Sequence, residues 1–122
     1  MNLPSLSDDI EKYLYTYRAH VSKVYDGDTI TVTIELGFNA VLKGEKLRFF
    51  GINAPEVRGD SKLEGIKSRD WLRNRILNKD IVIRTIKDKK GKYGRYLAII
   101  YLDDININDE LVNKGFAVYR DY

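Results

Sequence analysis

Polar and apolar residues alternate most regularly in the segment TITVTIEL, residues 29–36. A period of two predicts a strand with one buried face. Runs rich in β-branched and aromatic residues predict four more strands, at 17–25, 46–52, 80–86 and 96–102. Gly44 is placed in the loop before the third of the five strands.

Helical spacing is less regular. Trp71, Leu72 and Ile76 give partial i, i+4 spacing and predict a helix over 61–78. A last short helix, DELVNK, is predicted to be capped by Asn108 and closed by Gly115. Asp8 and Glu11 have the spacing of a capping box, so residues 8–15 are either a short helix or a frayed tail.

The predicted order is three strands, a helix, two strands and a helix. This order suits a mostly β (α+β) chain that forms a five-stranded OB-type barrel, with a helix between strands 3 and 4 and a short C-terminal helix. It excludes a parallel doubly wound sheet, because only one connection contains a long helix. We expect an N-terminal extension over 1–16 and one barrel domain over 17–122.

Composition narrows the chemistry. The chain has 122 residues, 43% of them hydrophobic, which is enough for one domain with a core. There is no cysteine and a single histidine, His20, so thiolate metal sites, serine–histidine sites and multi-histidine metal sites are excluded. We expect no role for His20. The net charge of +3 is compatible with a polyanionic partner.

The N-terminus has no basic region followed by an apolar one, so it does not resemble a signal peptide. No apolar run approaches the roughly 20 residues that cross a bilayer. We therefore expect a soluble, cytoplasmic protein with no membrane partner. Secretion stays open if a signal has been removed.

Four polar clusters lie at predicted strand ends or in loops: DGDT (26–29), LR (47–48), NAPE (53–56) and KYGR (92–95). Each has an ordinary structural explanation, such as a turn, an outward-pointing arginine or a solvated basic loop. Each also has a chemical one. Two acids around a glycine present hard oxygens to a cation such as Ca²⁺, and a basic loop with a tyrosine can face phosphates.

The combination and order of these clusters resemble the staphylococcal nuclease (thermonuclease-like) family. The resemblance runs from about Tyr17 to Tyr119 and includes the helix with Trp71 and the closing stretch INDELVNKGFAVY. It implies an OB-type barrel, as does the strand count. It also implies Ca²⁺-dependent cleavage of phosphodiester bonds in DNA or RNA.

The resemblance implies a role for each matching residue. Asp28, Asn53 and the carbonyl of Ala54 are the implied metal ligands, and Asp26 shapes the DGD loop. Catalysis falls to Arg48, Glu56 and Arg95. Glu56 acts as a general base or orients the attacking water. Binding of a terminal phosphate falls to Lys92 and Tyr93.

Asn53 departs from the family pattern, which commonly has aspartate there as a second carboxylate ligand. Calcium affinity depends on ligand charge, so weaker calcium binding is expected. The chain is then either an active nuclease that needs more calcium or a nucleic-acid-binding OB module without catalysis. The presence of Arg48, Glu56 and Arg95 favours activity. A protein-interaction module is a further alternative.

The C-terminus is a second departure. The best-known family member continues into a third helix, whereas this sequence stops at Tyr122. Either the segment 8–15 covers the barrel, which would bury Ile10, Tyr13 and Leu14, or a partner copy does. We expect a monomer or a weak homodimer.

Overall fold

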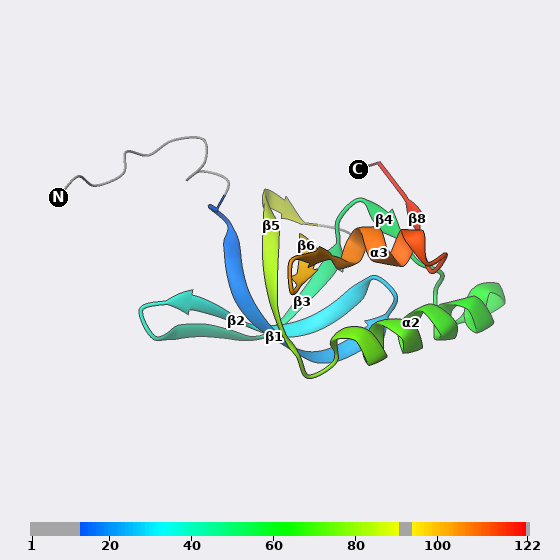
Figure 1. Ribbon diagram of the computed structural model, residues 1–122, viewed down its shortest axis with the longest axis horizontal. Coiled ribbons are helices and arrows are strands. Elements are labelled where there is room, and N and C mark those ends of the chain that lie inside the picture. Colours follow the sequence, from blue (N-terminus) through cyan, green and yellow to red (C-terminus); the bar gives the residue numbers. More distant parts are fainter. Residues whose placement is uncertain (1–12, 91–93, 122) are drawn as a thin grey trace.

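Five long strands curl into a closed barrel in the computed structural model, which describes residues 13–90 and 94–121 (Figure 1). Antiparallel neighbours follow the order β3-β2-β1-β5-β6, and a parallel pairing of β3 with β6 closes the barrel. The five strands are β1 (Thr16–Asp26), β2 (Thr29–Gly37), β3 (Ala40–Phe49), β5 (Asp80–Lys90) and β6 (Tyr96–Leu102).

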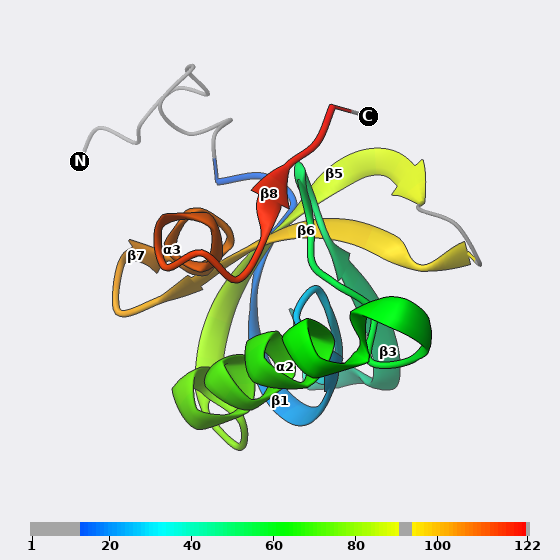
Figure 2. The same ribbon diagram turned by 90° about the vertical axis from the view of Figure 1, so that its right-hand side faces the viewer.

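Two helices and three short strands complete the described fold. A 3₁₀ turn, η1 (Gly59–Ser61), leads into α2 (Lys62–Ile76), and α3 (Ile107–Asn113) follows the barrel. Figure 2 shows α2 lying across one end of the barrel beside the β1–β2 turn. Short strands β4 (Ile52–Asn53) and β8 (Val118–Tyr119) pair with each other, and β7 (Ile105–Asn106) pairs with β6.

The core lies inside the barrel and under both helices. In β2, Ile30, Val32 and Ile34 are buried, while the alternate threonines face the other side. Each helix contributes one apolar stripe, Leu72 and Ile76 from α2 and Ile107 and Leu111 from α3. Trp71 stacks on Phe116 with ring centroids 5.5 Å apart, which joins α2 to the segment after α3.

The predicted fold class is confirmed: a five-stranded barrel with a helix between its third and fourth strands and a short C-terminal helix. The bounds of the third strand were wrong. It begins at Ala40 and runs through Gly44, which has a positive φ of 71° at a register shift between β2 and β3. A glycine that suggests a loop here serves a β-bulge.

The third strand also ends earlier than predicted. It stops at Phe49, and residues 52–53 form the separate strand β4. Gly51 lies between them with a φ of 78°, a conformation that breaks the strand. The fourth strand reaches Lys90, which pairs with Tyr96, so part of the predicted charged loop 87–95 belongs to β5.

The cap of the last helix is Asn106, not Asn108. The side chain of Asn106 accepts a hydrogen bond from the Asp109 N–H at 3.0 Å. Asn108 is buried and binds three backbone groups instead. Gly115 ends the segment with a φ of 83°, as its C-terminal position predicts.

Residues 8–15, predicted to be either a short helix or a frayed tail, are described only in part. Residues 8–12 lie outside the described residues, and 13–15 form a turn. Tyr13 and Leu14 are 67% and 49% exposed, so these two side chains do not show the burial that would follow if this segment covered the barrel. None of the described helices is both long and apolar enough to cross a membrane.

Candidate functional site

The DGD segment forms the turn between β1 and β2, and its shape comes from Asp26. The Asp28 N–H donates a hydrogen bond to Asp26 Oδ1 at 3.0 Å, which is the bond of an Asx turn. Gly27 allows the turn to lie close to α2. A Cβ at this position would lie 2.8 Å from the Cβ atoms of both Ala54 and Ser68. The turn therefore fixes Asp28 where β2 begins.

Asp28 is 4% exposed, and its carboxylate is held by three donors. Oδ2 accepts from the Ala54 N–H at 2.7 Å and pairs with Arg48 Nη1 at 2.9 Å. Oδ1 accepts from Thr29 Oγ1 at 3.2 Å. These bonds compensate for the cost of burying the charge.

Burial, with a further contribution from Asp26, raises the pKa of Asp28 to about 7, while Arg48 and the Ala54 N–H lower it. The charged form that a metal ligand needs is thus favoured by the arginine and the amide and opposed by desolvation.

Arg48 is the second buried charge. It lies at the end of β3 opposite Thr29 and is 8% exposed. Nη2 donates to Asn53 Oδ1 at 3.0 Å, and Nη1 donates to the Phe49 carbonyl at 3.3 Å. One guanidinium therefore joins Asp28 to Asn53, the two side chains predicted to bind a metal.

Arg95 reaches the same cluster from the segment before β6. Its Nη1 donates to Thr29 Oγ1 at 3.1 Å, and Thr29 in turn bonds Asp28. Arg48 and Arg95 are therefore both linked to one buried carboxylate, although 47 positions separate them in the chain.

Glu56 lies two residues after Ala54, with its side chain exposed. Its backbone is held by the 3₁₀ turn η1, because Ser61 Oγ donates to the Glu56 carbonyl at 3.2 Å. A Cβ on Gly65 would overlap that carbonyl and lie 2.8 Å from the Val57 nitrogen. The helix thus supports the turn that carries Glu56.

The structure brings together Asp28, Arg48, Asn53, Ala54 and, through Thr29, Arg95. Glu56 is joined to this cluster through the chain, two residues after Ala54. Lys92 and Tyr93 lie outside the described residues, so their predicted places are not tested.

Sequence reasoning assigned no role of their own to Gly27 and Thr29 of the DGDT cluster, or to Gly65. The alternation in β2 places Thr29 on the face opposite the apolar residues and says nothing of its partners. One of these partners, Arg95, lies far along the chain. Gly65 lies within a helix, where glycine is unfavourable. A glycine at such a position is a sequence signal of close packing.

The proposed metal ligands are all oxygen atoms, which suits a hard cation, but only one of them carries a negative charge. Asp28 supplies a carboxylate, Asn53 an amide oxygen and Ala54 a carbonyl, all oxygen ligands of the kind Ca²⁺ prefers. In the described residues, no group of three or more histidine, cysteine, aspartate or glutamate side chains could hold a metal. Asp28 Oδ2 and Asn53 Oδ1 already face one cation, the guanidinium of Arg48.

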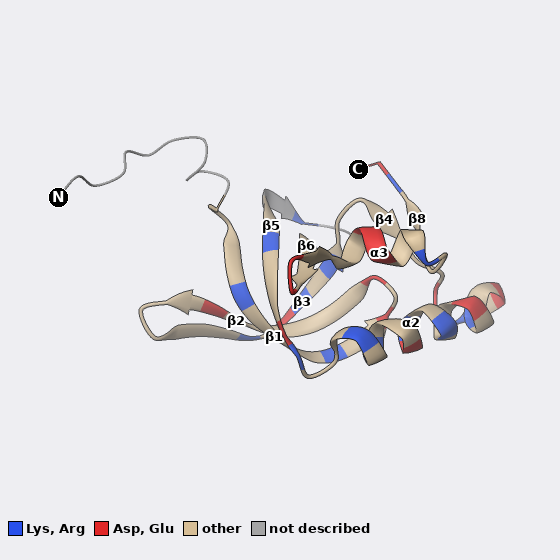
Figure 3. Cartoon of the chain, viewed as in Figure 1, with Lys and Arg blue, Asp and Glu red and all other residues tan. Residues whose placement is uncertain are grey.

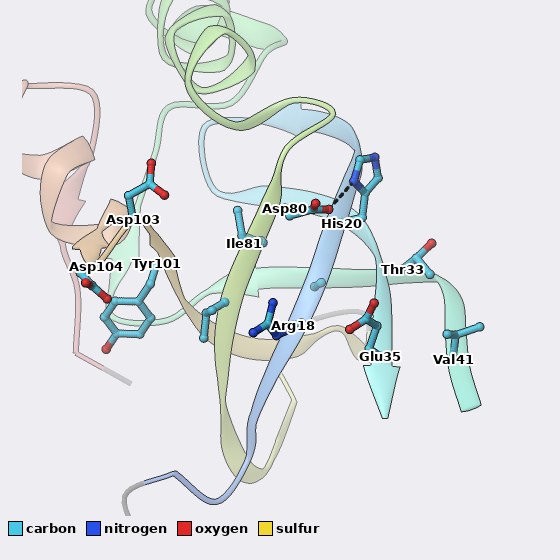
Figure 4. A pocket seen from close by; sticks show the side chains of 12 residues that line it. Arg18, His20, Thr33, Glu35, Val41, Asp80, Ile81, Tyr101, Asp103 and Asp104 are labelled. Carbon is cyan, nitrogen blue, oxygen red and sulfur yellow. Dashed lines mark hydrogen bonds and ion pairs between the residues drawn. The ribbon is translucent and has the colours of Figure 1, made fainter. Parts of the chain in front are cut away.

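A separate hollow of about 480 Å³ lies elsewhere on the barrel (Figure 4). His20 Nδ1 pairs with Asp80 Oδ1 at 2.9 Å there, and Arg18, Glu35 and Asp103 also line it. None of the predicted site residues lines this hollow. It therefore adds nothing to the candidate site.

The chain is similar to proteins of one known family. The family described as staphylococcal nuclease homologue matches residues 46–122. A thermonuclease of Staphylococcus hyicus is 30% identical over 88% of this chain and 60% of its own length. An uncharacterized endonuclease of Haemophilus influenzae is 35% identical over 84% of this chain and 52% of its own length.

An uncharacterized protein of Methanocaldococcus jannaschii is 30% identical over 83% of this chain and 58% of its own length. The chain thus spans between about half and three fifths of the length of these curated relatives. The matched family region contains Arg48, Asn53, Glu56 and Arg95, and the alignments extend over most of the barrel. The chain belongs to the staphylococcal nuclease homologue family.

Proposed function

We propose that this chain is a calcium-dependent nuclease that hydrolyses phosphodiester bonds of DNA, RNA or both. The observation that supports this most strongly is the buried Asp28–Arg48 pair, with Asn53 on the same guanidinium and Arg95 linked through Thr29. Two arginines beside a set of oxygen ligands suit a phosphodiester, which is itself anionic.

Arg48 and Arg95 are the phosphate-binding groups in this proposal. A guanidinium can donate two parallel hydrogen bonds to phosphate oxygens, and it stabilises negative charge that grows in the transition state. Arg48 is pre-positioned by its bonds to Asp28, Asn53 and the Phe49 carbonyl. A positioned donor loses less side-chain entropy when the phosphate arrives.

Glu56 acts on the attacking water. Its exposed carboxylate can accept a proton from that water, or orient the water by a hydrogen bond. Pro55 restricts Ala54 to an extended backbone, and Gly65 of α2 supports the Glu56 peptide from behind. The carboxylate therefore projects from a backbone fixed on two sides.

Asp28, Asn53 and the Ala54 carbonyl would hold the calcium ion, which would supply positive charge and orientation at the scissile phosphate. Asp28 is the sole carboxylate of this set, because position 53 is an amide. Fewer ligand charges mean weaker calcium binding. We therefore expect the enzyme to need more calcium than one with aspartate at position 53.

Lys92 and Tyr93 are proposed to bind a terminal phosphate of the substrate. Their support is their place in the KYGR segment, directly before Arg95. The protein is further proposed to act as a monomer or weak homodimer in the cytoplasm, with secretion open if a signal has been removed.

One specific observation favours a second function. Asn53 reduces the charge of the proposed metal site, so a nucleic-acid-binding module without catalysis remains the alternative. That module would bind DNA in EDTA and cleave nothing at any calcium concentration. A protein-interaction module would show no salt-dependent DNA binding.

The deciding experiment is cleavage of single-stranded DNA over a calcium series, with EDTA as the blank. Glu56→Gln removes the proposed base, and Glu64→Gln is the matched control, since Glu64 is an exposed glutamate in the first turn of α2. We expect Glu56→Gln to reduce cleavage at least a hundredfold, the lower range of general base catalysis, and Glu64→Gln to leave it unchanged.

If no cleavage is seen at millimolar calcium, the nuclease proposal is rejected and the nucleic-acid-binding module is the function that is left. Cleavage of equal strength by wild type and Glu56→Gln would point to a contaminating enzyme or to a different base.

A further inference from the structure

A groove with a volume of about 1270 Å³ runs beside the candidate site, between α2 and the outer face of β1, β2 and β3. Thr29 and Arg95 of the candidate site form part of its wall. The groove is therefore continuous with the place proposed for the scissile phosphate.

Two cross-strand rows connect the site to the groove. Asp26, Thr29 and Arg48 lie opposite one another on β1, β2 and β3, and so do Lys23, Thr31 and Lys46. Thr29 and Thr31 are two positions apart on β2, hence on the same face and roughly 7 Å apart along the strand. The lysine row thus lies next to the row that carries Arg48.

The walls of the groove are basic. Cations line it from four elements or segments, and none of its described lining residues is an aspartate or glutamate. They are Lys23, Lys46, Arg69, Arg73 and Arg95. In Figure 3, blue segments of β1 lie beside blue segments of α2.

Two of these cations have an acidic neighbour on their own helix: Asp70 Oδ1 lies 3.2 Å from Arg69 Nε and 4.0 Å from Arg73 Nη1. Asp26 is the acidic residue in the neighbouring cross-strand row, which contains Thr29 and Arg48. Arg73 also donates to the Val24 carbonyl at 3.3 Å, so it is held at the groove wall. A positive surface between low-dielectric walls attracts a polyanion more strongly than the net charge of +3 suggests.

An aromatic ring completes the surface. Tyr25 lines the groove and is 53% exposed. It falls at a register shift of β1 between Val24 and Asp26, and such bulges redirect side chains. A basic groove with an exposed aromatic ring is the usual surface for a single strand, since phosphates follow the cations and bases stack on the ring.

We infer that this groove binds a single strand of nucleic acid on one side of the scissile phosphate, with its phosphates on Lys23, Lys46 and Arg73 and a base on Tyr25. The inference rests on the proposed function, because that function places a phosphodiester at Arg48 and Arg95. It adds a binding surface that those two arginines do not supply.

The test compares two variants with equal net charge. The groove variant carries Lys23→Gln, Lys46→Gln and Arg73→Gln. The control carries Lys67→Gln, Arg84→Gln and Lys114→Gln, which remove three exposed cations that do not line the groove. Binding of a labelled oligothymidine, roughly 12 nucleotides long and within the length one OB barrel covers, is measured by anisotropy in EDTA.

We expect the groove variant to bind at least tenfold more weakly than the control. Its slope of log Kd against log salt should also be smaller by about 2, since each phosphate contact with a single strand contributes about 0.7. Equal Kd values for the two variants would overturn the inference, because they would show that only the net charge of the protein affects binding. Binding in EDTA requires no cleavage, so this result is independent of whether the chain proves to be a nuclease.

Two supplementary comparisons keep the test informative. If the triple variant does not fold, Lys23→Gln with Lys46→Gln is compared with Lys67→Gln with Lys114→Gln. Tyr25→Leu should weaken binding roughly fivefold, the lower range for stacking of one base, and Tyr25→Phe should restore it. Unchanged binding by Tyr25→Leu would remove the ring from the proposed surface.

Discussion

At the scale of single residues, the candidate site depends on one guanidinium that serves two acceptors. Arg48 pairs with the Asp28 carboxylate at 2.9 Å and donates to Asn53 Oδ1 at 3.0 Å. Asp28 is a carboxylate and Asn53 is a neutral amide, so the charge of Arg48 is balanced by one of its two side-chain acceptors. Removing one partner of such a buried pair is costly, because the other charge stays behind.

Asn53→Asp tests whether position 53 belongs to the metal site. A second carboxylate raises the ligand charge, so we expect the calcium concentration for half-maximal cleavage to fall several-fold. The measurement is a calcium titration of single-stranded DNA cleavage, repeated for Asn78→Asp, an exposed asparagine that follows α2.

An unchanged or higher calcium requirement for Asn53→Asp would place Asn53 outside the metal site. An equal decrease in the Asn78→Asp control would show that a general gain of negative charge explains the effect.

At the scale of elements, the site depends on how closely α2 approaches the two turns that carry its chemistry. Gly27 of the β1–β2 turn meets Ser68, and Gly65 meets the Glu56 peptide. Ser68 itself donates to the Phe116 carbonyl at 2.7 Å, which ties α2 to the segment after α3. The helix is therefore a support for the site as well as a cover for the core.

Gly65→Ala should push α2 and the Glu56 turn apart, because the added Cβ would overlap the Glu56 carbonyl. We expect a loss of about 2 kcal/mol in the free energy of unfolding, within the range for overpacking. We also expect kcat to fall at least tenfold with little change in KM, because a small displacement of a catalytic group is costly.

Asn74→Ala is the matched control, an exposed position of the same helix. Chemical denaturation gives the stability, and initial rates give kcat and KM. A variant with normal stability and normal kcat would mean that the turn adjusts freely and that α2 does not position Glu56.

Asn108 and Asn106 of the last helix allow a second comparison. Asn108 is 3% exposed, donates to the Phe50 and Ala98 carbonyls and accepts from the Ile100 N–H. Asn108→Ala leaves these buried groups without their partner, and we expect a loss of about 3 kcal/mol. Asn106→Ala removes only the helix cap and should cost about 1 kcal/mol.

Denaturant unfolding of both variants measures the two losses. The order of the values is the informative outcome. A larger loss for Asn106→Ala would show that the cap, and not the link from α3 to β6 and Phe50, stabilises this end of the barrel.

The elements were predicted from the sequence more reliably than their ends. The alternation of β2 and the apolar runs identified all five barrel strands. Gly44 was assigned to a loop because glycine is common both in loops and in β-bulges. Only the pairing register between β2 and β3 distinguishes the two cases. Asn108 was misassigned because its partners lie on β6 and at Phe50, which the local sequence around α3 does not indicate.

At the scale of the whole molecule, barrel closure brings the site together. The candidate residues come from the β1–β2 turn, the end of β3, the segment around β4 and the segment before β6. The parallel pairing of β3 with β6 places Arg48 opposite Leu97, two residues after Arg95. Motif order suggested which residues belong together, but their contacts depend on this closure, which no local pattern encodes.

Calcium should stabilise the whole domain if the site binds it, because a ligand of the folded state alone raises the free energy of unfolding. For a dissociation constant of about 1 mM, about 10 mM calcium adds roughly 1.4 kcal/mol and raises Tm by about 4 °C. Asn53→Asp should increase the shift and Asp28→Asn should abolish it. Thermal unfolding in calcium and in EDTA, with magnesium as the control ion, measures this without any substrate. An equal shift in Asp28→Asn, or none in Asn53→Asp, would locate calcium binding elsewhere or exclude it, since these two positions supply the only side-chain ligands proposed.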